Sequence, residues 1–251
     1  MLADPYFLAV IIPAVIALGL AKGGFAGVGV VATPLLALVM PPIEAAAVLL
    51  PILMVQDVIS VWVYHGDWSK PNLKVMVPGA ALGVGAAWLL ATYIPDAAVR
   101  VIVGMIGVGF VANIWLGRMP EQVKPNPPAG FFWGAVSGFT SAFASAGGPP
   151  FQLYVLPQRL PKLTLVGTVS IFFAVVNLLK VMPYLALGTF SHDGVVASLA
   201  MLPLAIASNL AGIWLVRITP VKAFYEIIYA LTFLLSLILI WQGGADLWRS
   251  A

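Results

Sequence analysis

The chain has 251 residues, of which 62% are hydrophobic and 8% are charged. A soluble domain carries about 25% charged residues, so this composition excludes a water-exposed globular surface and indicates an integral membrane protein. The 12 basic residues form no cluster, which excludes a nucleic-acid-binding surface. With no cysteine and only two histidines, the sequence predicts no disulfide and no metal or cofactor site.

Six stretches are apolar over the length of about 20 residues that a membrane-spanning helix needs. They cover approximately residues 43–64, 73–93, 97–116, 163–187, 194–216 and 221–241. Residues 6–40 and 130–156 differ, because each region holds two apolar pieces that are short for a full crossing. Glycine and proline interrupt the first region at Lys22-Gly23-Gly24 and the second at residues 145–150. Each region therefore predicts a broken or re-entrant helix pair, as found at transporter binding sites.

The two interrupted regions belong to an internal repeat of about half the chain. The matched positions are Gly24-Phe25 with Gly138-Phe139, Pro34 with Pro149, Pro78 with Pro203, and Pro95 with Pro220. We expect a first transmembrane repeat over residues 1–117, a linker over 118–128 and a second repeat over 129–251. The predicted fold is an all-α polytopic membrane protein of two inverted repeats, each with a broken helix pair and three spanning helices.

The loop cations predict how the repeats are oriented. If neither broken pair makes a net crossing, one face collects eight cations: Lys70, Lys74, Arg118, Lys124, Arg159, Lys162, Arg217 and Lys222. The other face then keeps two, Arg100 and Arg249, whereas one crossing per pair would divide the cations five against five. Positive charge favours the cytoplasmic face. We therefore expect inverted repeats with both termini outside the cytoplasm, which in a bacterial cell is the periplasmic side.

Two cations, Lys22 and Lys180, fall at membrane depth, where charges are costly and usually mark a pathway. Lys22 adjoins Gly23 and Gly24, whose backbone amides suit an anion. Lys180 shares a helix face with Asn177. Both lysines could instead extend to the interface, so an anion site and an interfacial role stay open for each.

Three further polar residues are candidates near the membrane midplane. Asp57 could carry a coupling proton or pair with Lys180, and a purely structural ion pair is the alternative. Gln56 and Asn177 occupy nearly equivalent positions of the repeat and could line a pseudo-symmetric substrate site. Hydrogen bonding between helices would equally account for them.

The glycine-rich breaks carry a resemblance to a known family. The run from Gly19 to Gly29, followed by Thr33-Pro34, resembles the opening glycine motif of the sulfite exporter TauE/SafE (TSUP, 4-toluene sulfonate uptake permease) family. The residues from Gly134 to Phe139, followed by Gly147-Gly-Pro-Pro-Phe-Gln152, resemble the second-half motif of that family. Gly23-x-x-x-Gly27 alone would also suit helix packing, but Pro149 and Pro150 cannot continue a helix interior. The resemblance implies a bacterial inner-membrane permease for sulfite, thiosulfate, sulfoacetate or other organosulfonates.

These observations together predict a secondary transporter for small sulfur-containing anions, with alternating access around a midplane site. Transport could be coupled to protons or driven by the substrate gradient alone. The expected partners are the anionic substrate and the lipid bilayer, and a homo-oligomer is left open. An intramembrane enzyme or a non-catalytic membrane assembly protein is the alternative, although the sequence predicts no enzyme. Besides Asp57 for coupling, the candidate substrate-binding residues are Lys22, Gly23, Gly24, Gly27, Gln56, Gly147, Gly148, Pro149, Gln152, Asn177 and Lys180.

Overall fold

The computed structural model describes residues 1–25, 28–90, 93–117, 123–186 and 188–250, and every regular element in these ranges is helical. The six expected spans all form helices. They are α3 (Pro42–Val63), α4 (Lys70–Leu90), α5 (Asp96–Trp115), α8 (Lys162–Ala186), α9 (His192–Ile218) and α10 (Val221–Ser250). The all-α membrane fold is thus confirmed.

Local chemistry accounts for several helix ends. Pro42 occupies the first turn of α3, where no backbone N–H is needed. Ser191 caps α9 by accepting a hydrogen bond from the backbone of Gly194 at 3.0 Å. At the other end of α9, the Nζ of Lys162 donates to the carbonyls of Val216 at 2.6 Å and Thr219 at 2.7 Å. A cation there suits the negative end of the helix dipole.

Both expected interruptions are present. Helix α1 (Pro5–Gly23) ends at Gly24, which has φ +140°, a conformation that glycine adopts readily. A 3-10 turn, η1 (Val28–Val31), and the short helix α2 (Ala32–Leu36) follow it. In the second half, α6 (Pro127–Ala144) ends at Ser145 in the left-handed region, and α7 (Gly148–Val155) continues into η2 (Leu156–Gln158).

The first broken pair consists of one long and one short helix, whereas the sequence predicts two pieces of similar length. Helix α1 has 19 residues, so the described residues contain seven helices that are long and apolar enough to span a membrane, rather than six. Pro13 does not end this helix, since neighbouring helices can compensate for a proline within a membrane helix. The second piece is much shorter than expected, because α2 has five residues.

In the described residues, each half of the chain has one long helix, one short helix and three long helices in that order, although the 3-10 turn precedes the short helix in the first half and follows it in the second. Both α1 and α6 begin with a proline directly after a capping residue, at Asp4-Pro5 and Asn126-Pro127. Gly24 lies just beyond α1, whereas Gly138 lies inside α6. The match of Gly24 with Gly138 therefore pairs unlike positions of α1 and α6, whereas the helix starts pair like positions.

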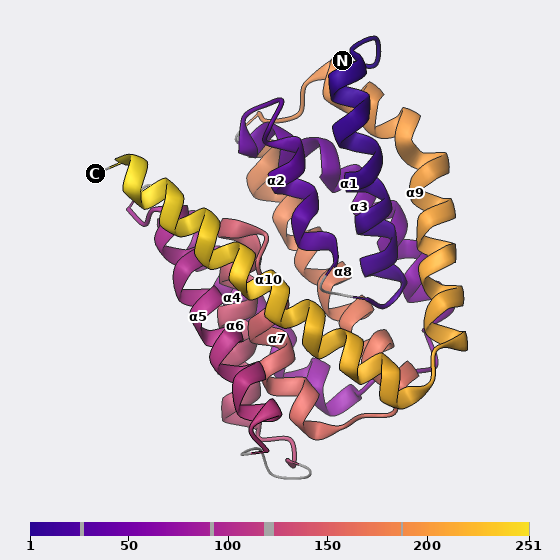
Figure 1. Ribbon diagram of the computed structural model, residues 1–251, viewed down its shortest axis with the longest axis vertical. Coiled ribbons are helices and arrows are strands. Elements are labelled where there is room, and N and C mark those ends of the chain that lie inside the picture. Colours follow the sequence, from indigo (N-terminus) through magenta and orange to yellow (C-terminus); the bar gives the residue numbers. More distant parts are fainter. Residues whose placement is uncertain (26–27, 91–92, 118–122, 187, 251) are drawn as a thin grey trace.

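Helices are exchanged between the two halves of the chain. Helix α1 packs against α9 of the second half, and α6 packs in the corresponding way against α4 of the first, while α3 meets α8 and α5 meets α10. Small residues permit both exchanged contacts: a Cβ at Gly23 would lie 2.5 Å from Gly212, and one at Gly83 would lie 2.0 Å from the carbonyl oxygen of Ala135. In Figure 1, α1 starts at the upper end of the molecule and α6 at the lower end, and both chain termini lie in the upper part.

The apolar core includes two main clusters of buried side chains, and each cluster contains helices from both halves of the chain. One cluster of buried side chains joins α1, α2, the first part of α3, and α9. A larger cluster joins α4, α7 and α8 with the ends of α3 and α9 and with α10. The polar residues described next lie where α1 and α3 face α6, α7 and α8.

Candidate functional site

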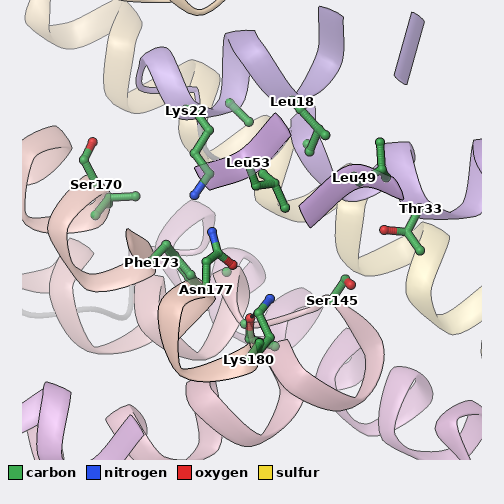
Figure 2. A pocket seen from close by; sticks show the side chains of 16 residues that line it. Leu18, Lys22, Thr33, Leu49, Leu53, Ser145, Ser170, Phe173, Asn177 and Lys180 are labelled. Carbon is green, nitrogen blue, oxygen red and sulfur yellow. Dashed lines mark hydrogen bonds between the residues drawn. The ribbon is translucent and has the colours of Figure 1, made fainter. Parts of the chain in front are cut away.

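A cavity of about 120 Å³ lies beside the two helix interruptions. Five of the predicted substrate-binding residues line it: Lys22, Gly147, Gly148, Asn177 and Lys180. They come from the end of α1, the start of α7 and the second half of α8. Figure 2 shows Lys22 and Asn177 pointing toward each other, with Lys180 one helical turn further along α8. The structure thus brings residues from both halves of the chain to one small space.

Asp57 connects the two sides of this cavity. Its Oδ1 atom accepts a short hydrogen bond and ion pair from the Nζ of Lys22. Its Oδ2 atom accepts a hydrogen bond of 2.7 Å from the Nδ2 of Asn177. Asp57 is buried but does not itself line the cavity. The sequence offered Lys180 as the partner of Asp57, and the structure gives Lys22 in its place.

Lys180 is buried, with 8% of its surface exposed, and its Nζ lies 3.3 Å from the Oγ of Ser141. Among the described residues, the ion pairs include none between Lys180 and a carboxylate. The ammonium group therefore meets a hydroxyl and the cavity, and its positive charge is not neutralised by direct pairing. An unpaired charge inside a membrane is costly unless a ligand compensates it.

The start of α7 adds backbone donors to the same wall. The first N–H groups of a helix have no partner within the helix, and they face negative charge favourably. Since proline has no N–H, Pro149 and Pro150 contribute none, and the amides at this end come from Gly147 and Gly148. A Cβ at Gly148 would meet nothing within 4 Å. The backbone at Gly148 is thus open toward the cavity.

Several further lining residues, which carry hydroxyl or aromatic groups, are not among the residues predicted from the sequence. They are Thr33 on α2, Ser141 on α6, Ser145 directly after α6, and Ser170 and Phe173 on α8. Two spacings could have indicated them. Ser137, Ser141 and Ser145 recur at every fourth residue, and residues 170, 173, 177 and 180 form one stripe of a helix. Both are patterns of a polar helix face within apolar sequence.

Four other predicted residues lie outside the lining of the cavity. Gly23 packs against Gly212 of α9, and its carbonyl accepts a hydrogen bond of 2.8 Å from the hydroxyl of Tyr64. Gly24 supplies the turn after α1. Gln152 is buried and accepts a short hydrogen bond from Thr232 on α10. Pro149 is buried in the first turn of α7. Gly27 lies outside the described residues.

Gln56 faces α9 rather than the cavity. Its Nε2 donates to the carbonyl oxygen of Ala205 at 3.1 Å, and its buried Oε1 has no hydrogen-bond partner among the described residues. One turn further on, the Oγ of Ser60 donates to the carbonyl of Lys22 at 2.9 Å and accepts from Asn209 at 3.1 Å. These bonds fix the end of α1 between α3 and α9. They hold the backbone of Lys22 in place while its side chain reaches Asp57.

The described residues contain no group of three or more His, Asp and Glu side chains that could hold a metal ion. The lining supplies hydrogen-bond donors and positive charge: two lysines, hydroxyls, the amide of Asn177 and a helix N-terminus. Such an arrangement can bind a small anion without a metal.

Comparisons with known proteins agree with the motifs. The profile of the family described as sulfite exporter TauE/SafE matches residues 11–239. Part of the chain is also similar to curated proteins named "Aromatic amino acid transport protein AroP". The protein of Escherichia coli (strain K12) is 30% identical over 139 residues, covering 45% of this chain and 29% of its own length. That of Salmonella typhimurium (strain LT2) is 32% identical over 115 residues, covering 41% and 24%.

The chain spans less than a third of the length of these curated relatives. No solved structure matches it. Since the family profile covers most of the chain and describes a transporter rather than an enzyme, and since the helices are those of a multi-pass membrane protein, the chain belongs to the sulfite exporter TauE/SafE family of membrane transporters.

Proposed function

We propose that this protein is a secondary transporter for a small sulfur-containing anion such as sulfite, thiosulfate or a short organosulfonate like sulfoacetate, and that the anion binds in the cavity beside Lys180. The observation that carries the proposal is the buried ammonium group of Lys180, which lines the cavity and has no ion-pair partner among the described residues. An anion in the cavity would supply the missing negative charge.

The size of the cavity supports a small substrate. Sites for drug-sized ligands have volumes of about 300–1,000 Å³, whereas this cavity has about 120 Å³. One water molecule occupies about 30 Å³ of liquid, so the space suits an anion of only a few heavy atoms. The family name points to sulfite for relatives of this chain, and a tetrahedral or pyramidal sulfur oxyanion has this size.

We further propose that the two halves are inverted repeats that move around this site in alternating access, in a bacterial inner membrane. The opposite starting ends of α1 and α6 and the paired exchange of helices support this proposal. The described loop cations support periplasmic termini, since seven lie at the end where α4, α6, α8 and α10 begin and two at the other. Arg118 lies outside the described residues.

The purified protein in detergent should show a higher unfolding temperature with its substrate than without, because a ligand that binds only the native state stabilises it. The ligands to compare are sulfite, thiosulfate, sulfoacetate, taurine, sulfate and phenylalanine, with chloride as a control. We expect one sulfur anion to stabilise the protein selectively, and Lys180→Ala to abolish this effect. Lys74→Ala, which removes an exposed lysine of α4, should leave it unchanged.

Uptake of the same anion into liposomes should follow the binding result. A variant Lys180→Ala that still binds and transports the anion as well as wild type would contradict the proposed site. Stabilisation by phenylalanine alone would favour an amino acid as substrate instead, in line with the partial similarity to AroP.

A further inference from the structure

We propose that Asp57 determines how many negative charges the cavity accepts: a monoanion binds while Asp57 is ionised, and a dianion binds only together with one proton on Asp57. This inference rests on the proposed anion transport and adds a rule for substrate charge and proton stoichiometry. It follows from the unequal surroundings of the two lysines. Lys22 is already paired with Asp57, whereas Lys180 is not paired with a carboxylate among the described residues.

The charges around Asp57 can be taken helix by helix. Helix α1 presents Lys22, and α8 presents the neutral Asn177 and the charged Lys180. Helix α9 places the uncharged residues Ala205 and Asn209 against α3, and α2 has no charged residue. With both lysines and Asp57 ionised, the net charge of the site is +1. A monoanion brings it to zero.

A dianion would leave the same site with a net charge of −1. Excess charge in a low-dielectric interior is strongly unfavourable, so the dianion requires one more positive charge. A proton on the carboxylate of Asp57 supplies it: one O–H bond forms, and Lys22 keeps its own proton and its positive charge. Three positive contributions then face the ligand and the cavity: Lys22, Lys180 and the N-terminus of α7.

The geometry allows this switch without contact between Asp57 and the substrate. Asp57 lies behind the lining, whereas Lys22 and Lys180 both belong to it. Protonation of Asp57 ends the ion pair and frees the ammonium group of Lys22 for an anion that Lys180 already binds. The neutral carboxyl group can still accept the hydrogen bond from Asn177. Either substrate then moves one net negative charge per cycle, but only the dianion carries a proton with it.

The test compares two ligand classes on the purified protein from about pH 5.5 to about pH 7. Methanesulfonate is a monoanion over this range, and thiosulfate and sulfate are dianions. Calorimetric titration gives the Kd, and repetition in buffers of different ionisation enthalpy counts the protons taken up. We expect a constant Kd for methanesulfonate. For the dianion, we expect Kd to fall by about tenfold per pH unit of acidification, as one proton per bound anion requires.

Two charge variants test the rule in opposite directions. Asp57→Asn imitates the protonated carboxyl group. The Kd of the dianion should therefore become independent of pH, and its binding should take up no proton. Lys22→Gln lowers the net charge of the site by one, so methanesulfonate should now bind with one proton and show the pH dependence of a dianion in wild type. Lys74→Gln is the matched control and should behave as wild type.

The outcomes separate this inference from the proposed function. Dianion binding to wild type without proton uptake, or proton-coupled dianion binding that persists in Asp57→Asn, would overturn the charge rule and leave an anion transporter. Failure of both ligand classes, and of the other sulfur anions, to bind at any pH would overturn the proposed function itself. If Asp57→Asn fails to fold, the wild-type proton count and Lys22→Gln still decide the question.

Discussion

Gly147 and Gly148 are neighbours in the chain and both line the cavity, yet a methyl group would act differently at each. At Gly147 a Cβ would lie 2.7 Å from the carbonyl oxygen of Ser137 and 2.7 Å from the Cβ of Ser141. At Gly148 it would meet no atom within 4 Å and would extend toward the cavity. One glycine therefore serves helix packing, and the other keeps space for a ligand.

We expect Gly148→Ala to keep the unfolding temperature of wild type while it weakens anion binding by about tenfold, since an added methyl group in a filled site costs about 1–3 kcal/mol. Gly147→Ala should instead lower the stability of the protein by a similar amount. Thermal unfolding with and without the anion measures both effects. Equal stability losses in the two variants would contradict the assignment of separate roles.

The sequence indicates which residues form the site better than it indicates which of them pair with one another. Lys22 and Lys180 stand out because charges are rare in these apolar segments. The choice of Lys22 over Lys180 as the partner of Asp57 depends on how α1, α3 and α8 approach one another, and no local pattern encodes that approach. Ser141 and Ser170 give no such signal, because single hydroxyl residues are common in membrane helices, where they also serve packing.

The packing of helix α4 against helix α6 depends on glycines that allow the two backbones to approach each other. A Cβ at Gly83 would lie 2.0 Å from the carbonyl oxygen of Ala135, whereas one at Gly85 of the same helix would meet nothing within 4 Å. Close backbone approach through small residues is a general source of helix association in membranes. The two glycines thus form a matched pair for testing the contact.

Gly83→Ala should destabilise the protein by at least about 1–3 kcal/mol, because the two helices must separate to admit the methyl group. Gly85→Ala should be neutral or slightly stabilising, since alanine favours a helix by up to about 1 kcal/mol over glycine. Denaturant unfolding in detergent, followed by circular dichroism, measures the difference. A neutral Gly83→Ala would show that α4 and α6 do not pack as described.

Helix existence and both interruptions could be predicted, because apolar length, Gly-Gly and Pro-Pro are strong local signals. The length of α1 and the shortness of α2 could not. The sequence places the break at Lys22-Gly23-Gly24 correctly but predicts a piece too short for a full crossing before it, whereas α1 runs through Pro13 over 19 residues. The exchange of α1 and α6 between halves joins residues that are far apart in sequence, and only the packed structure reveals it.

For the whole molecule, the exchange divides the site between two groups of helices. Lys22 and Asp57 lie on α1 and α3, which share a core cluster with α9. Lys180 and Ser141 lie on α8 and α6, on the opposite side of the cavity. The hydrogen bond from Asn177 to Asp57 joins the two groups. A movement that opens the cavity between these groups would therefore break this bond.

The absence of cysteine makes the proposed orientation directly testable. Tyr93, in the turn between α4 and α5, is 79% exposed, and Lys124, before α6, is exposed at the opposite end. In intact cells, a membrane-impermeant maleimide should label Tyr93→Cys but label Lys124→Cys only after permeabilisation. The reverse pattern would place both termini in the cytoplasm, and labelling of both variants from outside would contradict a single orientation.

The exchange of helices also determines when the chain can finish folding during its synthesis. Helix α1 leaves the ribosome well before α9, the helix of the second half against which it packs. Helix α4 must wait in the same way for α6. The first half therefore enters the membrane with two glycine-lined faces uncovered, and it reaches its final packing only after the second half has been inserted beside it.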